Sequence, residues 1–307
     1  MDIFFQQVIN GLVQGSIYAL VALGYTMVYG IMGLINFAHG EVVMIGTLVA
    51  ITVTTSLIGA GVPVTVAGLG GLVAAMLVSM ALGWSLERVA YRPLRGSPRL
   101  TPLITAIGMS IILQNLAMII WGRNYLTFPP LLPKINYEFA GAHFTLVQVA
   151  IVVISAAAMS GLVFLVYRTR LGMAMRATAQ NPAVASLMGV NINRVIAAAF
   201  VVGSALAAVA GVMVGSYYEI AHYQMGFMLG LKAFTAAVLG GIGNLAGAMA
   251  GGVLLGLIEA LGAGYIGDLS GGFLGSHYQD IFAFIVLIVV LMFKPSGLFG
   301  EKTGDRA

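Results

Sequence analysis

Cysteine is absent from this chain of 307 residues, and charged side chains are rare. Lys, Arg, Asp and Glu together make up 8% of the residues, whereas hydrophobic residues make up 60%. A soluble domain carries about 25% charged residues, because water must wet its surface. So few charges cannot cover a globule of this size, which excludes a soluble enzyme. The absence of cysteine excludes disulfide frameworks, thiolate catalysis and cysteine-ligated zinc.

A nucleotide-binding P-loop is also absent. Its Gly-x-x-x-x-Gly-Lys-Ser/Thr motif needs a lysine directly after a glycine, and none of the four lysines follows one. No Gly-x-Ser-x-Gly elbow, catalytic Ser/His/Asp order or paired-histidine metal motif occurs either. We therefore expect no enzymatic activity, no cofactor and no metal site in this chain.

Long uncharged stretches dominate what is present. A membrane-spanning helix needs about 20 mostly apolar residues to cross the hydrocarbon layer. Stretches free of Asp, Glu, Lys and Arg occur at 3–40, 42–86, 100–122, 139–167, 195–218, 233–258 and 281–293. The second is long enough for two spans with a turn near 59–63, whereas the last is short for one. The pattern predicts an all-α polytopic integral membrane protein, with residues 1–307 forming one transmembrane domain of about eight helices, one or two of them discontinuous.

Basic residues gather in two loops, near 87–99 and 168–194, and in the tail 294–307. These segments hold 11 of the 14 Lys and Arg residues, Arg99, Lys302 and Arg306 among them. The positive-inside rule places such segments in the cytoplasm, so we expect the N-terminus outside and the C-terminus inside. Since the positive charge lies between apolar runs, it indicates membrane lipid and not nucleic acid as the surroundings. Trp84 and Tyr91 flank the first loop, as interfacial aromatic residues do.

Polar residues beside glycines inside the apolar stretches are candidates for a translocation path. Paired interruptions in two halves of a chain are typical of the discontinuous helices that line such paths. His39 and Glu41 would diverge on a regular helix, so only a break lets both face one cavity. The alternative is a polar anchor that holds the broken ends together, and Lys232 and Glu259 are better explained as interface or structural groups. The path candidates are Asn36, His39, Glu41, Lys232, Gly241, Gly243 and Asn244.

A short helix is predicted within the second basic loop. Asn181 suits the N-cap, Pro182 the first helical position and Gly189 the position after the last turn. This spacing predicts about seven helical residues on the cytoplasmic side. The apolar residues that this helix would expose there are Val184, Leu187 and Met188. A partner surface explains them, and a position on lipid headgroups is the alternative.

Blocks in order along almost the whole chain resemble a known family. They are Ile35-Asn-Phe-Ala-His-Gly-Glu41, Ser85-Leu-Glu-Arg-Val-Ala-Tyr-Arg-Pro-Leu-Arg95, Lys232-Ala-Phe-Thr-Ala-Ala-Val-Leu-Gly-Gly-Ile-Gly243, Gly247-Ala-Met-Ala-Gly-Gly252 and Pro295-Ser-Gly-Leu-Phe-Gly300. The chain resembles the LivH-type permeases, which are membrane subunits of high-affinity branched-chain amino-acid ABC importers. The first and third blocks are the most specific.

The resemblance implies a set of partners in the bacterial inner membrane. These are a second, LivM-like permease, two cytoplasmic ABC ATPases that use ATP and Mg²⁺, and a periplasmic substrate-binding protein. It also implies that Pro182–Met188 is the coupling helix that docks into an ATPase. The residues expected to couple are Arg176, Asn181, Pro182, Val184, Leu187, Met188 and Gly189.

Alternatives to a branched-chain amino-acid permease remain at this point. An ABC permease for urea or short amides shares the Ala-His-Gly-Glu element of the first block. A secondary transporter coupled to H⁺ or Na⁺ through His39 and Glu41 would work without ATPases. An intramembrane hydrolase is disfavoured, because that pair has neither a nucleophile nor a second metal ligand beside it.

Overall fold

The structure is a computed structural model that describes residues 2–98, 100–139, 141–269 and 279–300. Within these residues seven helices are long and apolar enough to cross a membrane. They are α1 (Asp2–Met32), α2 (His39–Gly59), α3 (Val64–Leu86), α4 (Leu100–Trp121), α5 (Leu146–Arg168), α8 (Ile192–Tyr218) and α10 (Leu245–Leu269). The predicted all-α polytopic architecture is confirmed.

Two further helices are apolar but shorter, α9 (Met225–Gly240) and α11 (Gln279–Phe293). At 1.5 Å per residue, the sixteen residues of α9 extend about 24 Å, less than the hydrocarbon thickness. Against the predicted count of about eight spans, the described residues hold seven helices of spanning length, and α9 and α11 are shorter. The predicted tail residues Lys302 and Arg306, together with Arg99, lie outside the described residues.

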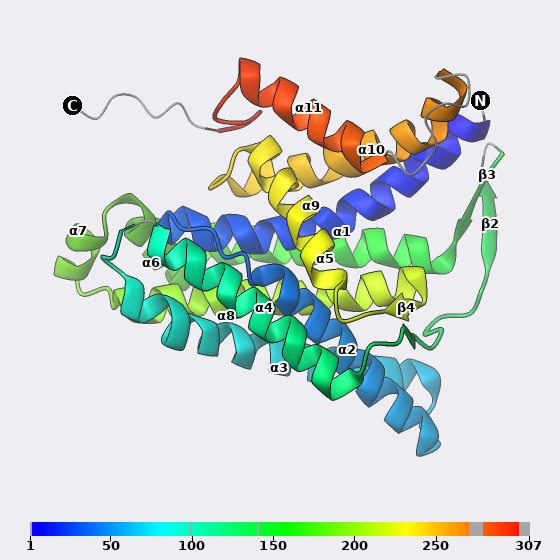
Figure 1. The fold of residues 1–307 in the computed structure, drawn as a ribbon, viewed down its shortest axis with the longest axis horizontal. Helices are drawn as coiled ribbons and strands as arrows, with labels where there is room; N and C mark the ends of the chain where they lie inside the picture. Colours follow the sequence, from blue (N-terminus) through cyan, green and yellow to red (C-terminus); the bar gives the residue numbers. More distant parts are fainter. Residues whose placement is uncertain (1, 99, 140, 270–278, 301–307) are drawn as a thin grey trace.

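The long helices lie side by side, and different short elements occupy the two ends of the bundle (Figure 1). One end holds α6 (Arg170–Gln180) and α7 (Pro182–Leu187). The other end holds the start of α1 and the hairpin of β2 (Asn136–Phe139) and β3 (Ala142–Thr145). Strands β1 (Leu126–Thr127) and β4 (Ile220–Ala221) pair antiparallel and join the segment after α4 to the segment after α8.

Helix α1 forms the centre of the bundle and contacts α5, α8, α9 and α10. Its packing on α10 depends on small residues, since added Cβ atoms at Gly11, Gly15 or Gly256 would meet backbone atoms of the facing helix. Small residues let helix backbones approach closely in a membrane, where the hydrophobic effect does not drive helices together. Backbone contact between α1 and α10 therefore brings together the first and last thirds of the chain.

The predicted interruptions are present. Helix α2 ends at Gly59 and α3 begins at Val64, which confirms two spans in the longest uncharged stretch. Residues 33–38 separate α1 from α2, and residues 241–244 separate α9 from α10. Both interruptions are therefore breaks at which the chain leaves the helix.

Candidate functional site

Asn36 holds the first break together. Its side-chain Oδ1 accepts hydrogen bonds from the Ala38 amide at 3.1 Å and from the Tyr91 hydroxyl at 2.8 Å. Its backbone carbonyl accepts the His39 amide at 3.0 Å. Gly33, with a φ of 65°, lets the chain turn away from the end of α1. Since Asn36 is buried, its polar atoms serve the break itself.

His39 and Glu41 lie in the first turn of α2 and point to different helices. The His39 ring packs edge-on to Tyr25 of α1, with centroids 4.9 Å apart. The Glu41 carboxylate accepts hydrogen bonds from Ser110 Oγ at 3.0 Å and Gln114 Nε2 at 2.7 Å, both on α4. Both side chains are buried. The break ends just before His39, so both residues lie on the regular helix α2, two positions apart. Their side chains therefore diverge and do not face one cavity.

Gly40, between these two residues, brings α2 against α9. A Cβ added at Gly40 would overlap the carbonyl oxygen of Gly226 and lie 2.9 Å from Cα of Gly230. Only a glycine permits this contact, because backbone atoms on both helices form it. The His-Gly-Glu sequence thus places three neighbouring residues against three different helices, α1, α9 and α4.

The second break depends on two glycines and one asparagine. Gly241 and Gly243 have φ values of 104° and 98°, which side chains disfavour. Asn244 precedes α10, and its Oδ1 accepts the Gly247 amide at 3.1 Å. Asn36 and Asn244 therefore have similar roles. Each side-chain oxygen accepts a hydrogen bond from a backbone amide at the start of the helix that follows its break.

The segment after α11 completes the second break. The amides of Leu298 and Phe299 donate to the carbonyls of Leu239 and Gly240 at 2.9 and 3.0 Å. The Asn244 Nδ2 donates to the Phe299 carbonyl at 3.0 Å. Carbonyls at a helix end need such partners when the helix stops inside a membrane protein. This segment therefore belongs to the structure of the break.

Lys232 is the centre of an ion-pair cluster that joins four helices. Its Nζ lies 3.1 Å from Glu259 Oε2 on α10 and 2.7 Å from Asp280 Oδ1 on α11. The Tyr18 hydroxyl of α1 donates to the same Glu259 oxygen at 2.8 Å. Glu259 is buried, so the contacts meet the need of a buried charge for a partner. They fit the interface or structural role that the sequence favours for Lys232 and Glu259.

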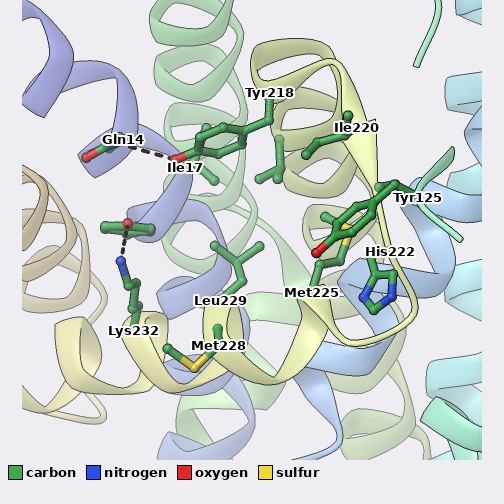
Figure 2. Close-up of a pocket in the computed structure, with 13 residues that line it drawn as sticks. Gln14, Ile17, Tyr125, Tyr218, Ile220, His222, Met225, Met228, Leu229 and Lys232 are labelled. Atoms are coloured by element: carbon green, nitrogen blue, oxygen red, sulfur yellow. Dashed lines mark hydrogen bonds between the residues drawn. The ribbon is translucent and has the colours of Figure 1, made fainter. Parts of the chain in front are cut away.

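A cavity of about 250 Å³ lies beside this cluster (Figure 2). Its walls come from α1, α8, α9, β4 and the loop before β1. The lining residues are Gln14, Ile17, Tyr18, Tyr125, Val214, Tyr218, Ile220, Ala221, His222, Met225, Met228, Leu229 and Lys232. Of the seven path candidates, only Lys232 contributes to this lining.

Helix α7 has the predicted capping. The Asn181 side chain accepts the Val184 amide at 3.1 Å, Pro182 is the first helical residue, and Gly189 follows the helix with a φ of 86°. The helix is one residue shorter than predicted, because Met188 is its C-cap. Its apolar side chains are exposed, Val184 at 53%, Leu187 at 87% and Met188 at 79%. Helix α7 lies at one end of the bundle (Figure 1), so these exposed apolar side chains lie at that end.

Arg176 lies on α6 and contacts the end of α5. Its guanidinium is 5.3 Å from the centre of the Tyr167 ring, a cation–π distance. Met175 beside it is buried in the bundle. Arg176 thus helps to hold α6, and with it α7, against the transmembrane helices.

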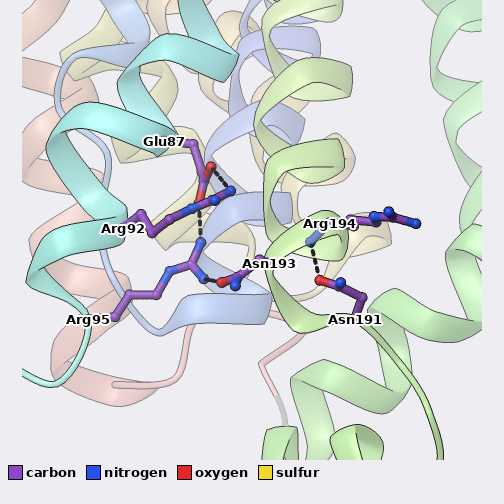
Figure 3. A network of polar contacts seen from close by, with 6 residues as sticks. All are labelled: Glu87, Arg92, Arg95, Asn191, Asn193 and Arg194. Carbon is purple, nitrogen blue, oxygen red and sulfur yellow. Dashed lines mark hydrogen bonds and ion pairs between the residues drawn. The ribbon is translucent and has the colours of Figure 1, made fainter.

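Glu87 is the residue at this end that the sequence did not single out. Its fully buried carboxylate binds Arg92 at 2.9 Å and also Arg95, whose other guanidinium nitrogen binds Asn193 at the start of α8 (Figure 3). Burial lowers the pKa of Arg95, whereas the nearby Glu87 charge raises it. The signal in the sequence was that Glu87 is the one acidic residue in the basic loop 87–99.

The loop residues next to Glu87 form a π-helix, η1 (Glu87–Tyr91), followed by a 3₁₀ turn, η2 (Arg92–Leu94). Tyr91 in η1 is only 1% exposed and packs on Phe200 of α8, with ring centroids 5.1 Å apart. The prediction of an interfacial Tyr91 is therefore wrong. Its hydroxyl finds a buried partner in Asn36, and Trp84 is 47% exposed.

Comparison with known proteins gives a match over nearly the whole chain. The family described as "Branched-chain amino acid transport system / permease component" matches residues 7–291. The chain belongs to this permease family. It is accordingly a transport subunit and not an enzyme, and the ion-coupled transporter suggested by His39 and Glu41 is not supported.

Named relatives of the permease agree in length as well as in sequence. The branched-chain amino acid permease protein BraD of Pseudomonas aeruginosa is 48% identical, covering 99% of this chain and 98% of its own. The permease proteins LivH of Salmonella typhimurium and Escherichia coli K12 are each 46% identical, covering 99% of this chain and 97% of their own. All three are named as components of high-affinity branched-chain amino acid transport systems.

The predicted site residues of the permease thus fall into separate groups. Asn36, Gly241, Gly243 and Asn244 build the two breaks, and His39 and Glu41 pack against different helices. Lys232 alone lies at the described cavity. The coupling candidates lie together on α6, α7 and the turn after them.

Proposed function

We propose that this permease forms half of the translocation path of an ABC importer for branched-chain amino acids. Its partners are a second permease of the LivM type, two ATPases that consume ATP with Mg²⁺, and a periplasmic binding protein that delivers the amino acid. The names of its relatives at 46–48% identity support this substrate class. The chain lacks a P-loop of its own, so the proposal assigns ATP to the partner ATPases.

The observation that carries the proposal is the exposed apolar surface of α7. Leu187 and Met188 are among the most exposed apolar side chains of the described residues, although α7 is not one of the seven helices of spanning length. An apolar surface beyond the membrane is explained by a protein partner. A groove on an ATPase is the partner that an ABC permease requires.

The membrane orientation is inferred from the basic residues near the end of the bundle that carries α7. Arg88, Arg168 and Arg170 lie near the end that carries α6 and α7, as the positive-inside rule expects of a cytoplasmic side. The start of α1 and the β2–β3 hairpin lie at the opposite end (Figure 1). We therefore place the N-terminus in the periplasm and the C-terminus in the cytoplasm of a bacterial inner membrane.

ATP would act on the permease through α7. When the two ATPases close on ATP, they would pull on Pro182–Met188 and switch the permease between outward-facing and inward-facing states. The breaks at 33–38 and 241–244 would respond first, because the chain can change shape there more readily than within a regular helix.

Purification of the permease from its native membrane in a mild detergent tests the assembly. We expect two P-loop ATPases and a second polytopic subunit to copurify, and the complex in liposomes to take up leucine only with ATP and the loaded binding protein. A permease that purifies alone, with uptake lost to an uncoupler, would contradict the proposal. Uptake of urea in preference to leucine would keep the ABC assembly and contradict the substrate class.

A further inference from the structure

The cavity beside Lys232 has two chemically different ends. Gln14, the Tyr218 hydroxyl and Lys232 lie on one side of it in Figure 2, whereas Ile220 and Met225 lie on the other. Met228 and Leu229 of α9 lie between these two groups. The Tyr125 hydroxyl and the His222 ring lie on this second side too, among its apolar side chains. A small molecule that fills the cavity would therefore meet Gln14, Tyr218 and Lys232 at one end and a mostly apolar wall at the other.

We propose that this cavity is a binding site for a free α-amino acid with an aliphatic side chain, on the way through the permease. This inference rests on the proposed function and adds a location to it. The location differs from the Asn36–Glu41 segment, where Asn36 Oδ1 and Glu41 Oε1 accept hydrogen bonds that hold helices together.

The size of the cavity suits a single amino acid. It encloses about 250 Å³, which is below the range of about 300–1,000 Å³ typical of pockets for drug-sized ligands. Water alone would gain few hydrogen bonds along the apolar wall, so an aliphatic side chain is the better occupant there.

The polar end can take both charged groups of an amino acid. The Gln14 amide donates to the Tyr218 oxygen at 3.4 Å, which leaves the amide oxygen able to accept and the hydroxyl able to donate. The hydroxyl suits the ligand carboxylate, and the amide oxygen suits its ammonium. Lys232 also lines this end, and its charge is balanced by Glu259 and Asp280, which do not line the cavity.

The apolar end suits side chains of differing branching. Met225 and Met228 are flexible and polarisable, so they can adapt to a leucine, isoleucine or valine side chain without a rigid fit. Tyr125 and His222 stack at this end, with ring centroids 4.6 Å apart and an interplanar angle of 25°. The stack joins the loop before β1 to the loop before α9 at the rim.

The absence of cysteine allows a direct test. Met228→Cys would carry the one thiol of this subunit, and its alkylation by N-ethylmaleimide can be followed by the mass of the subunit within the reconstituted complex. We expect leucine delivered by the binding protein to slow alkylation several-fold. Leu69→Cys is the matched control, because Leu69 is 64% exposed on α3 and does not line the cavity. Its alkylation should not respond to leucine.

Met228→Trp provides a second measurement, because the larger ring would fill the cavity from its rim. We expect leucine uptake to fall several-fold while the complex still assembles and hydrolyses ATP, whereas Leu69→Trp should transport normally. Normal uptake by Met228→Trp, or no protection of Met228→Cys in a complex that does transport leucine, would overturn the site and leave the proposed function standing. A wild-type complex that transports no leucine would overturn the proposed function, and the site with it.

Discussion

The hydroxyl of Tyr91 donates a hydrogen bond to the side-chain oxygen of Asn36 across 2.8 Å, although the two residues are 55 positions apart. Tyr91 lies in the π-helix that follows α3, and Asn36 lies in the break between α1 and α2. The bond therefore connects the basic loop, which packs on α8, to the break between α1 and α2. Through this connection a shift of α8 can move the break.

Tyr91→Phe removes this bond and keeps the ring. We expect a loss of about 1 kcal/mol in the free energy of unfolding, and leucine uptake lowered several-fold, because the side-chain oxygen of Asn36 loses one of its two donors. Thermal unfolding and uptake in liposomes measure the two effects. Tyr167→Phe is the control, since Tyr167 is 52% exposed and its ring remains available to Arg176. Equal behaviour of both variants would contradict a role for the Tyr91 hydroxyl.

Leu187→Glu places a charge in the exposed apolar surface of α7. We expect uptake to be lost while the permease still inserts into the membrane, because a carboxylate in an apolar interface loses its hydration without gaining a partner. Uptake and the amount of ATPase that copurifies are the measurements. Leu187→Met keeps the apolar character and should transport normally. Wild-type uptake by Leu187→Glu would rule out the docking of this surface on an ATPase.

Glu87→Gln removes the buried charge that binds two arginines. We expect the free energy of unfolding to fall by about 2 kcal/mol, since hydrogen bonds to charged groups are the stronger ones. Glu219→Gln is a matched control, because the Glu219 side chain is 46% exposed in its pair with Lys134. An exposed pair contributes about 1 kcal/mol at most. Thermal unfolding in detergent compares the two variants. Similar midpoints would contradict the claim that the buried Glu87 stabilises the permease more than the exposed Glu219 does.

Gly40→Ala adds a methyl group where α2 meets α9. We expect a loss of about 1–3 kcal/mol in stability, because the methyl would overlap backbone atoms that cannot rotate away. Gly108→Ala on α4 has no atom within 4 Å of the added group, so it should be neutral or slightly stabilising. Yield and thermal unfolding of the two variants are the measurements. A stable, active Gly40→Ala would show that α2 and α9 do not pack this closely.

The features that the sequence predicted correctly are those with local chemical causes. The capping of α7 by Asn181 and Pro182 depends on residues within a few positions of one another. The same holds for the turn after Gly59 and for the break at Gly241, where backbone conformation sets the choice of residue. The lengths of the stretches without charged residues were enough to predict where the long helices lie.

The features that the sequence missed depend on contacts between distant segments. Tyr91 looked interfacial beside a basic loop, and only the packing of α8 and the break around it buries the ring. His39 and Glu41 looked like a pair that could face one cavity, yet each packs against a different helix. The Lys232–Asp280 ion pair and the cavity beside it likewise require the relative positions of helices, which no local pattern contains.

The hydrogen bonds from Leu298 and Phe299 to the end of α9 also bear on how the protein is made. Phe299 follows Asn244, its partner at the second break, by 55 residues. During synthesis, α9 and the start of α10 therefore leave the ribosome well before these partners exist. We expect the carbonyls of Leu239 and Gly240 to have other hydrogen-bond partners during insertion, and the second break to close only after residues 298 and 299 have left the ribosome.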